Sequence, residues 1–182
     1  MAFTVTKTIA LVGLMGAGKT AVGTLVAQKL GVPFLDTDSE IVKAANMSIA
    51  EIFSRDGEDF FRAKETQVLE RLLQGPPCIL STGGGAYLAQ QNRQLIGKHG
   101  IALWLQADLP LLWSRVKNKT TRPLLQTDNP HQTLSDLFDA RAPIYAKAEL
   151  STSSQAGISL ADMAEKVIAT LLADPQSGVT QG

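Results

Sequence analysis

The segment GLMGAGKT, residues 13–20, constrains this chain more than any other part of its sequence. It follows an apolar run, precedes a stretch with helical spacing and matches the pattern G-x-x-x-x-G-K-[ST]. In such a loop the backbone N–H groups surround phosphates, Lys19 reaches the β- and γ-phosphates, and the Thr20 hydroxyl ligates magnesium. The loop predicts a nucleoside triphosphate site with Mg²⁺, and a switch, a pump or a small-molecule kinase would each satisfy it. The residues expected at the nucleotide are Gly16, Ala17, Gly18, Lys19, Thr20 and Ala21.

Short apolar runs alternate with longer helical stretches along the chain. The runs TIALV and IALWL are apolar at every position, as strands covered on both faces would be. This alternation predicts an α/β fold with βαβ units around a parallel sheet. A chain of 182 residues, 45% of them hydrophobic, is long enough for one domain with a sizeable core. We expect that domain to span residues 1–173 and residues 174–182 to form a disordered tail.

The region after residue 45 carries clear helix signals. Ser48 and Glu51 form an S-x-x-E capping box, and Gly57 indicates a break before the next helical stretch. In that stretch the apolar residues at roughly helical spacing predict a buried stripe. The polar segment 117–131 is long enough to predict a functional or mobile loop. The stripe comprises Phe61, Val68, Leu69, Leu72 and Leu73.

Charge and cysteine content exclude several classes of function. The 17 basic and 17 acidic residues cancel, so neither nucleic acid nor an anionic membrane surface is expected as a partner. No segment approaches the ~20 consecutive apolar residues that span a bilayer. Cys78 is the one cysteine, which excludes an internal disulfide and a multi-cysteine zinc site. We expect a cytoplasmic protein that acts as a monomer.

Two aspartates follow the strand-like run PFL. Asp36 and Asp38 lie two residues apart, and in extended geometry such residues share one side. At the carboxyl edge of a parallel sheet they would face the phosphate loop. One carboxylate would hold a magnesium-bound water, and the other would orient or deprotonate an attacking hydroxyl. The alternative is that Asp38 only caps the helix that follows.

Three consecutive glycines follow a further apolar run. In STGGGA, residues 83–85 would let a ligand approach the backbone closely at a strand end, although a tight turn would also use glycine. If the sheet is parallel, three strand ends bring the phosphate loop, the aspartates and the glycines to the same edge. That convergence predicts a ligand site there.

Six motifs occur in order between Ile9 and Tyr145: GLMGAGKT, DTD, GEDFFRAKE, STGGGA, RPLL and RAPIY. Together they resemble the shikimate kinases. The resemblance implies a three-layer P-loop kinase fold with a five-stranded parallel sheet and helices on both faces. It also implies a helical substrate-binding flap at about residues 37–65 and a mobile lid at about residues 117–131. The implied reaction moves the ATP γ-phosphate to the 3-hydroxyl of shikimate, a step toward chorismate and the aromatic amino acids.

The resemblance also implies roles for charged residues around the acceptor. Asp38 would bind ring hydroxyls and act as base or orienter, and Asp36 would support Mg²⁺ through water. Arg62 and Arg141 would clamp the substrate carboxylate, because guanidinium groups bind carboxylates through paired donors. The alternative for Arg62 is a helix-surface ion pair with Glu58 or Glu65. The alternative for Arg141 is a solvated helix residue.

The remaining implied contacts involve backbone and lid. Gly83, Gly84 and Gly85 would contact shikimate, with Gly84 the best candidate for a direct hydrogen bond. Arg122 would move with the lid and stabilise the transferring phosphoryl group, which makes Lys19, Asp38 and Arg122 the catalytic set. Arg115 would stack on adenine, or alternatively lie exposed over its helix. Residues 151–159, on the adenine side, give no residue match.

Two rival functions remain at this point. A gluconate-type sugar kinase shares the phosphate loop, and its substrate also has a carboxylate. A non-enzymatic GTP switch would need N-K-x-D to read guanine, and the nearest segment, NKTT at Asn118, lacks the aspartate.

Overall fold

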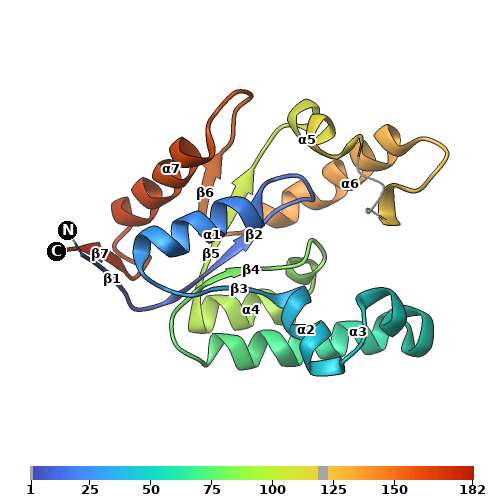
Figure 1. Ribbon diagram of the computed structural model, residues 1–182, viewed down its shortest axis with the longest axis horizontal. Helices are drawn as coiled ribbons and strands as arrows, with labels where there is room; N and C mark the ends of the chain where they lie inside the picture. Colours follow the sequence, from blue (N-terminus) through green and yellow to red (C-terminus); the bar gives the residue numbers. More distant parts are fainter. Residues whose placement is uncertain (1, 119–122) are drawn as a thin grey trace.

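The computed structural model describes residues 2–118 and 123–182 (Figure 1). Its strands are β1 (Phe3–Val5), β2 (Thr8–Val12), β3 (Phe34–Asp36), β4 (Ile79–Ser81), β5 (Gly100–Gln106), β6 (Leu150–Ser153) and β7 (Val179–Gln181). Its α-helices are α1 (Lys19–Leu30), α2 (Thr37–Ala45), α3 (Ile49–Leu73), α4 (Gln90–His99), α5 (Leu109–Val116), α6 (Pro130–Tyr145) and α7 (Leu160–Ala173). Two short 3₁₀ helices are η1 (Ala86–Leu88) and η2 (Pro123–Leu125).

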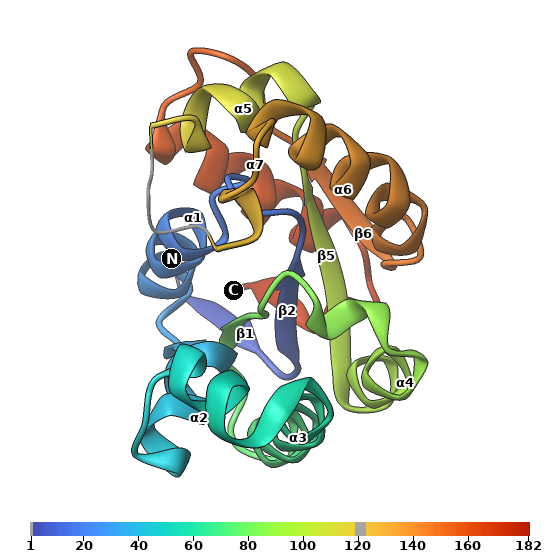
Figure 2. The same ribbon diagram turned by 90° about the vertical axis from the view of Figure 1, so that its right-hand side faces the viewer.

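Five strands form one parallel sheet in the order β3-β4-β2-β5-β6. The central strand β2 pairs with both β4 and β5, and every one of its residues is buried. In Figure 2, α1 and α7 lie on one side of this sheet, and α4 and α6 lie on the other. Helices on both faces explain why the central strands are apolar throughout. The predicted α/β class and five-stranded parallel sheet are confirmed.

The helix signals after residue 45 correspond to α3. Its N-cap is Ser48, whose Oγ accepts a hydrogen bond from the Glu51 N–H at 3.1 Å. Gly57 has φ 85° and ψ 173°, so the helix is kinked there, as the predicted break requires. All five residues of the expected stripe are buried in the hydrophobic core. The second half of α3 therefore has a fixed orientation relative to the sheet.

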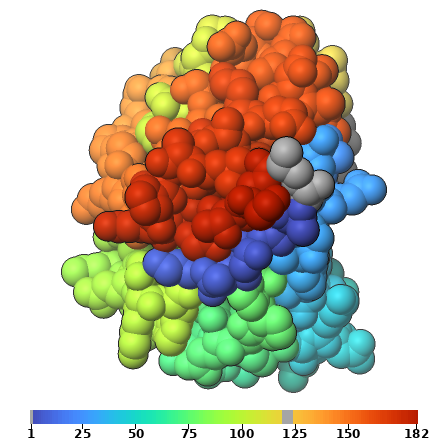
Figure 3. All heavy atoms as spheres, turned by 90° about the vertical axis from the view of Figure 1, so that its left-hand side faces the viewer, coloured from blue at the N-terminus to red at the C-terminus, as the bar shows by residue number. Residues whose placement is uncertain are grey.

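The C-terminal segment is not a disordered tail, and that prediction is wrong. Residues 179–181 form β7, which pairs antiparallel with β1 in register Phe3↔Gln181 and Val5↔Val179. Ser177 is fully buried, and its Oγ donates to the Leu171 carbonyl at 2.6 Å. Figure 3 shows this C-terminal segment (red) lying against the N-terminal strand (blue). The polar, glycine-containing composition concealed a strand because its partner comes from the other end of the chain.

Among the helices of the described residues, none has the length and hydropathy needed to cross a membrane.

Candidate active site

Three loops lie at the carboxyl ends of adjacent strands. The phosphate loop follows β2, the aspartates lie where β3 becomes α2, and the glycine triplet follows β4. Because β3, β4 and β2 are neighbours in a parallel sheet, these loops meet at one edge. Figure 2 shows α2 and α3 on one side of this edge and η2, α5 and α6 on the other. The helices on both sides contribute the charged residues described below.

The phosphate loop has a backbone that only glycine adopts readily. Gly16 and Gly18 have φ of 85° and 96°, and a Cβ on Gly16 would lie 2.9 Å from a Val116 methyl group. The Lys19 ammonium donates hydrogen bonds to the carbonyls of Gly13 and Leu14, so its side chain follows the loop.

The start of α1 offers N–H groups to an anion. The Val22 N–H donates to the Gly18 carbonyl at 2.9 Å, so the N–H groups before Val22 belong to the open first turn of the helix. Thr20 and Ala21 are exposed in this turn. The positive end of the helix dipole adds to the attraction for phosphate.

Arg115 of α5 connects the phosphate loop to the segment after β6. Its Nη1 donates to the Gly16 and Ala17 carbonyls at 2.9 and 3.3 Å, and its Nη2 donates to Ser154 Oγ at 3.1 Å. The guanidinium is therefore anchored and does not lie free over its own helix. Ser154 falls in the segment 151–159, for which no family residue could be matched, and no local signal marks it as a partner of Arg115.

The two aspartates differ from expectation in how they reach the site. The chain turns into α2 at Thr37, and the N-cap is Asp36, whose Oδ1 accepts from the Ser39 N–H at 3.0 Å. The alternative that Asp38 caps this helix is wrong, and so is the assumption of extended geometry between the two residues. Asp38 instead reaches the site from the first turn of α2.

The surroundings of Asp38 are those of a site residue. Burial raises the pKa of this carboxyl above its ordinary value, and the charge of Asp36 raises it further. The charges of Lys19 and Arg62 act in the opposite direction, which means that both cations lie near Asp38. The structure therefore brings together residues from the phosphate loop, α2 and α3. A carboxyl group with a shifted pKa beside a phosphate loop is a candidate for proton transfer.

Each glycine of the triplet faces a different charged side chain. A Cβ on Gly83 would lie 2.8 Å from Asp38 Oδ1, and a Cβ on Gly84 would lie 3.2 Å from an Arg141 nitrogen. A Cβ on Gly85 would lie 2.6 Å from an Arg62 nitrogen. The triplet does lie in a turn, in which the Ala86 N–H donates to the Gly83 carbonyl at 3.0 Å. None of the three glycines has a positive φ, so this turn does not itself require glycine, and the close approach of the charged side chains explains their identity.

Arg62 of α3 is held by two carboxylates. Its Nη1 lies 3.0 Å from Glu65 Oε1, and its Nε lies 3.6 Å from Glu58 Oε1. Glu65 is 1% exposed, and burial raises its pKa while the charge and hydrogen bond of Arg62 lower it. The expected helix pair is present, and the same guanidinium also packs on Gly85. The two explanations of Arg62 therefore hold together.

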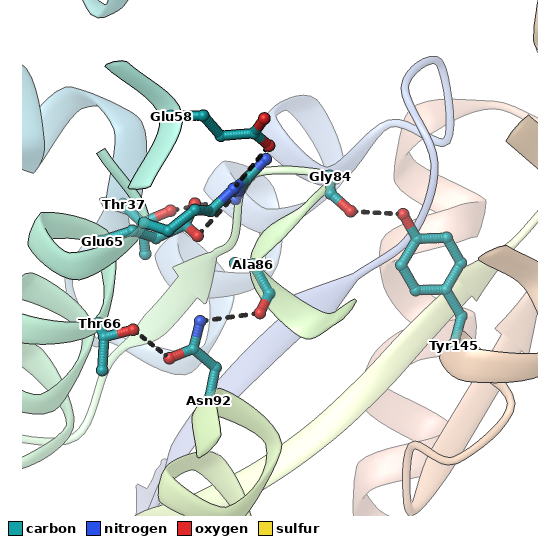
Figure 4. Close-up of polar contacts among 10 residues, drawn as sticks. Thr37, Glu58, Glu65, Thr66, Gly84, Ala86, Asn92 and Tyr145 are labelled. Atoms are coloured by element: carbon teal, nitrogen blue, oxygen red, sulfur yellow. Dashed lines mark hydrogen bonds and ion pairs between the residues drawn. The ribbon is translucent and has the colours of Figure 1, made fainter. Parts of the chain in front are cut away.

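Arg141 and Tyr145 of α6 complete the contacts of the triplet. Arg141 is half-buried against Gly84, so it is not a solvated helix residue. The Tyr145 hydroxyl donates to the Gly84 carbonyl at 2.6 Å (Figure 4). Sequence reasoning assigned no role to Tyr145. Its spacing of four residues from Arg141, on the same helix face, was the available signal.

A buried amide also links the elements around the triplet. Asn92 of α4 accepts a hydrogen bond from the Thr66 hydroxyl at 2.8 Å and donates to the Ala86 carbonyl at 2.9 Å (Figure 4). Asn92 is 1% exposed. This link joins α3, one residue beyond Glu65, to the residue that follows the triplet. It depends on tertiary contact alone, and the sequence carries no signal for it.

The described part of the chain contains no group of three or more His, Cys, Asp or Glu that could hold a metal ion. A magnesium ion bound through nucleotide phosphates, water and one or two protein oxygens needs no such group. Arg122, expected on the lid, lies outside the described residues.

Comparison with known proteins gives a consistent set of relatives. The model of the shikimate kinase family matches residues 15–172. The chain is 58% identical to a shikimate kinase of Ruegeria pomeroyi over 165 residues, which cover 91% of this chain and 85% of that protein. It is 57% identical to a shikimate kinase of Cereibacter sphaeroides over 169 residues, covering 93% and 84% of the two chains.

Solved structures agree with the sequence comparison. Shikimate kinase from Acinetobacter baumannii in complex with shikimate superposes with a TM-score of 0.87 at 38% identity, covering 93% of this chain and 95% of that one. A gluconokinase from Sinorhizobium meliloti gives a TM-score of 0.61 at 16% identity, covering 93% and 94%. The gluconokinase shares the fold. At 16% identity, this similarity gives no information about the substrate of the present chain.

Proposed function

This chain belongs to the shikimate kinase family, and from that premise we propose which residues transfer the ATP γ-phosphate to the 3-hydroxyl of shikimate. The proposal depends on one observation above all. Beside the phosphate loop, Gly83 lies against Asp38, Gly84 lies against Arg141 and Gly85 lies against Arg62. The gluconate alternative is not favoured, because the gluconokinase is the more distant structure in both identity and TM-score.

The phosphate side of the reaction belongs to the loop and α1. Lys19 would contact the β- and γ-phosphates, and the backbone of residues 16–21 would donate N–H groups to them. Arg115 would lie at the adenine, which its anchorage between the loop and Ser154 supports. Arg122 would add a positive charge at the transferring phosphoryl group. These groups act by position and charge rather than by covalent chemistry.

The acceptor side has one negative and two positive side chains. Shikimate carries a carboxylate on one part of its ring and hydroxyls on another. This distribution matches a site with two arginines and with Asp38, which lies near Lys19 of the phosphate loop. The arginines would bind the carboxylate, and Asp38 would accept a hydrogen bond from the reacting hydroxyl. Backbone groups of Gly83–Gly85 would contact the substrate, with Gly84 in the middle. The raised pKa of Asp38 makes it a better proton acceptor than an ordinary aspartate.

Magnesium would be held by Thr20 and, through water, by Asp36. Thr20 is exposed at the start of α1, and one oxygen of Asp36 caps α2, which leaves its other oxygen for a water ligand. Hydroxyl and carboxylate oxygens are the ligands that Mg²⁺ prefers. When bound, the ion would neutralise charge on the phosphates.

We assign residues 37–65 to a substrate-binding flap and residues 117–131 to a lid that closes over the nucleotide. The working unit would be a monomer. The partners would be ATP and shikimate, without nucleic acid or membrane. ATP as co-substrate supports a location in the cytoplasm.

A coupled assay of ADP release tests the assignment. We expect turnover with shikimate, little with gluconate and little without an acceptor. Lys19→Met should abolish turnover while circular dichroism and melting temperature stay near those of the wild type. Equal rates with shikimate and gluconate would contradict the proposed acceptor site, and full activity of Lys19→Met would contradict the phosphate site.

A further inference from the structure

Tyr145 lies at the end of α6, four residues after Arg141, so both side chains project from the same face of the helix. The tyrosine is 2% exposed, and its ring centre lies 6.2 Å from that of Trp104 on β5. Packing of this kind restricts the ring to one orientation. The phenolic oxygen is therefore held at a fixed point beside the glycine triplet.

The hydroxyl of Tyr145 has two neighbours. It donates to the Gly84 carbonyl at 2.6 Å, and the Arg141 guanidinium lies close enough to lower the pKa of the phenol. A phenol has one proton to donate and lone pairs that accept. Because the proton is used on Gly84, the lone pairs remain available to the guanidinium of Arg141, which lies against the same glycine. Tyr145 and Arg141 therefore meet at Gly84.

We propose that Tyr145 is a positioning residue, which anchors Arg141 to Gly84 and so sets where the carboxylate of shikimate is bound. This inference rests on the proposed role of Arg141 in the carboxylate clamp. It also gives a cause for the position of the Arg141 guanidinium. A Cβ on Gly84 would lie 3.2 Å from an Arg141 nitrogen and 3.9 Å from the Tyr145 hydroxyl, so both groups pack on this glycine.

The two arginines of the clamp are oriented by different chemistry. Arg62 pairs with Glu58 and Glu65, whereas within residues 2–118 and 123–182 no carboxylate lies within ion-pair distance of Arg141. A neutral hydroxyl can orient a guanidinium without cancelling its charge. Arg141 thereby keeps its full attraction for a ligand carboxylate, with which a protein carboxylate would compete.

The phenol keeps its proton in this environment. Burial raises the pKa of Tyr145 above its ordinary value, although the charge and hydrogen bond of Arg141 act against that rise. The hydroxyl therefore remains a donor to Gly84 across the neutral range.

The test is Tyr145→Phe, which removes one oxygen and keeps the ring. We expect KM for shikimate to rise roughly three- to tenfold, the range of one hydrogen bond, with kcat and KM for ATP within about twofold of wild type. Tyr87→Phe is the matched control. Tyr87 is 3% exposed in η1, just after the triplet, and its hydroxyl makes no hydrogen bond in the described part of the chain. This control should leave all three constants unchanged.

A double-mutant cycle with Arg141→Ala separates the positioning role of Tyr145 from the binding of carboxylate by Arg141. If Tyr145 acts through Arg141, Tyr145→Phe should raise KM for shikimate in the wild-type background and have no further effect in Arg141→Ala. An unchanged KM in Tyr145→Phe, with a raised KM in Arg141→Ala, would overturn the positioning role and leave the clamp standing. An unchanged KM in Arg141→Ala would overturn the clamp itself. If Tyr145→Phe raised KM for shikimate and lowered kcat by similar factors, and also lowered the melting temperature, the tyrosine would only stabilise the fold.

Discussion

Arg115 donates a hydrogen bond from Nη1 to the Gly16 carbonyl at 2.9 Å, and so joins α5 to the phosphate loop across 99 residues of chain. The same guanidinium reaches Ser154 after β6. A single side chain thus connects the phosphate loop to the segment after β6, where we propose that the adenine binds. Its loss should affect the nucleotide and spare the acceptor.

We therefore expect Arg115→Ala to raise KM for ATP about tenfold or more, with little change in KM for shikimate. The magnitude follows from the loss of charge-assisted hydrogen bonds, each contributing about 1.5–3 kcal/mol. Lys98→Ala, at the exposed C-terminal end of α4, is the matched loss of one positive charge and should change neither constant. Initial rates, measured while each substrate is varied in turn, give KM for ATP and KM for shikimate. A change confined to shikimate would contradict the placement of Arg115.

Asp38→Asn should lower kcat by about 10²–10⁴, the usual contribution of a general base. The same substitution should stabilise the fold near neutral pH. Since the folded pKa of Asp38 is raised, the folded protein binds this proton more tightly than the unfolded chain does, and the ionised form opposes folding. The gain in melting temperature should be largest well above the raised pKa and disappear below the ordinary pKa of about 3.9.

Thermal melts of wild type and Asp38→Asn from pH 4 to pH 8 measure this difference. In the wild type, kcat/KM for shikimate should fall as pH drops through the raised pKa of Asp38, and this acid limb should be missing from the residual activity of Asp38→Asn. Near-normal turnover by the variant would remove Asp38 from the catalytic set. A variant that melts lower than wild type at pH 8 would contradict the direction of the pKa shift.

Gly85→Ala should weaken shikimate binding without unfolding the protein. The backbone of Gly85 has φ −91°, which alanine adopts without strain. The added Cβ would lie 2.6 Å from an Arg62 nitrogen, so the guanidinium must move away from the triplet. We expect KM for shikimate to rise at least tenfold and KM for ATP to stay the same.

Gly75→Ala is the control for this change. Its Cβ would lie no closer than 3.4 Å to any neighbour, in the turn after α3. Isothermal titration with shikimate gives the affinity directly. Wild-type affinity in Gly85→Ala would show that the position of Arg62 against the triplet does not matter for the acceptor.

The sequence predicted the strands of the sheet better than it predicted the residues that hold the site in place. The strands TIALV and IALWL could be recognised because burial on both faces leaves an apolar run, and the phosphate loop because its glycines adopt conformations other residues avoid. Both are properties of short segments. By contrast, Asn92, Ser154 and β7 act through partners that are distant in the chain, and nothing in their own segments indicates those partners.

The aspartates show an intermediate case. Their residue types and their strand-end location predicted that they lie beside the phosphate loop, and Asp38 does lie near Lys19. Asp36, however, is the cap of α2, and Asp38 is a residue of its first turn. The strand is short, and the position at which extended chain becomes helix cannot be read from DTD. A shift of one or two residues in that boundary exchanges the roles of two identical side chains.

Removal of residues 179–182 should destabilise the protein without altering the site. The deletion removes β7 and exposes the surface that Val179, 3% exposed, covers. Burial of one valine contributes about 1.5–3 kcal/mol, which for a chain of this length lowers the melting temperature by about 3–12 °C. KM for both substrates should stay the same, because β1 and β7 form a sheet separate from the one that carries the loops. Removing only Gly182 serves as the control: it loses one terminal hydrogen bond, from its N–H to the Ala2 carbonyl at 3.0 Å, and should lower the melting temperature much less. If the longer deletion melts with the wild type, the terminal strands add nothing to stability, and the segment behaves as the tail that its composition predicted.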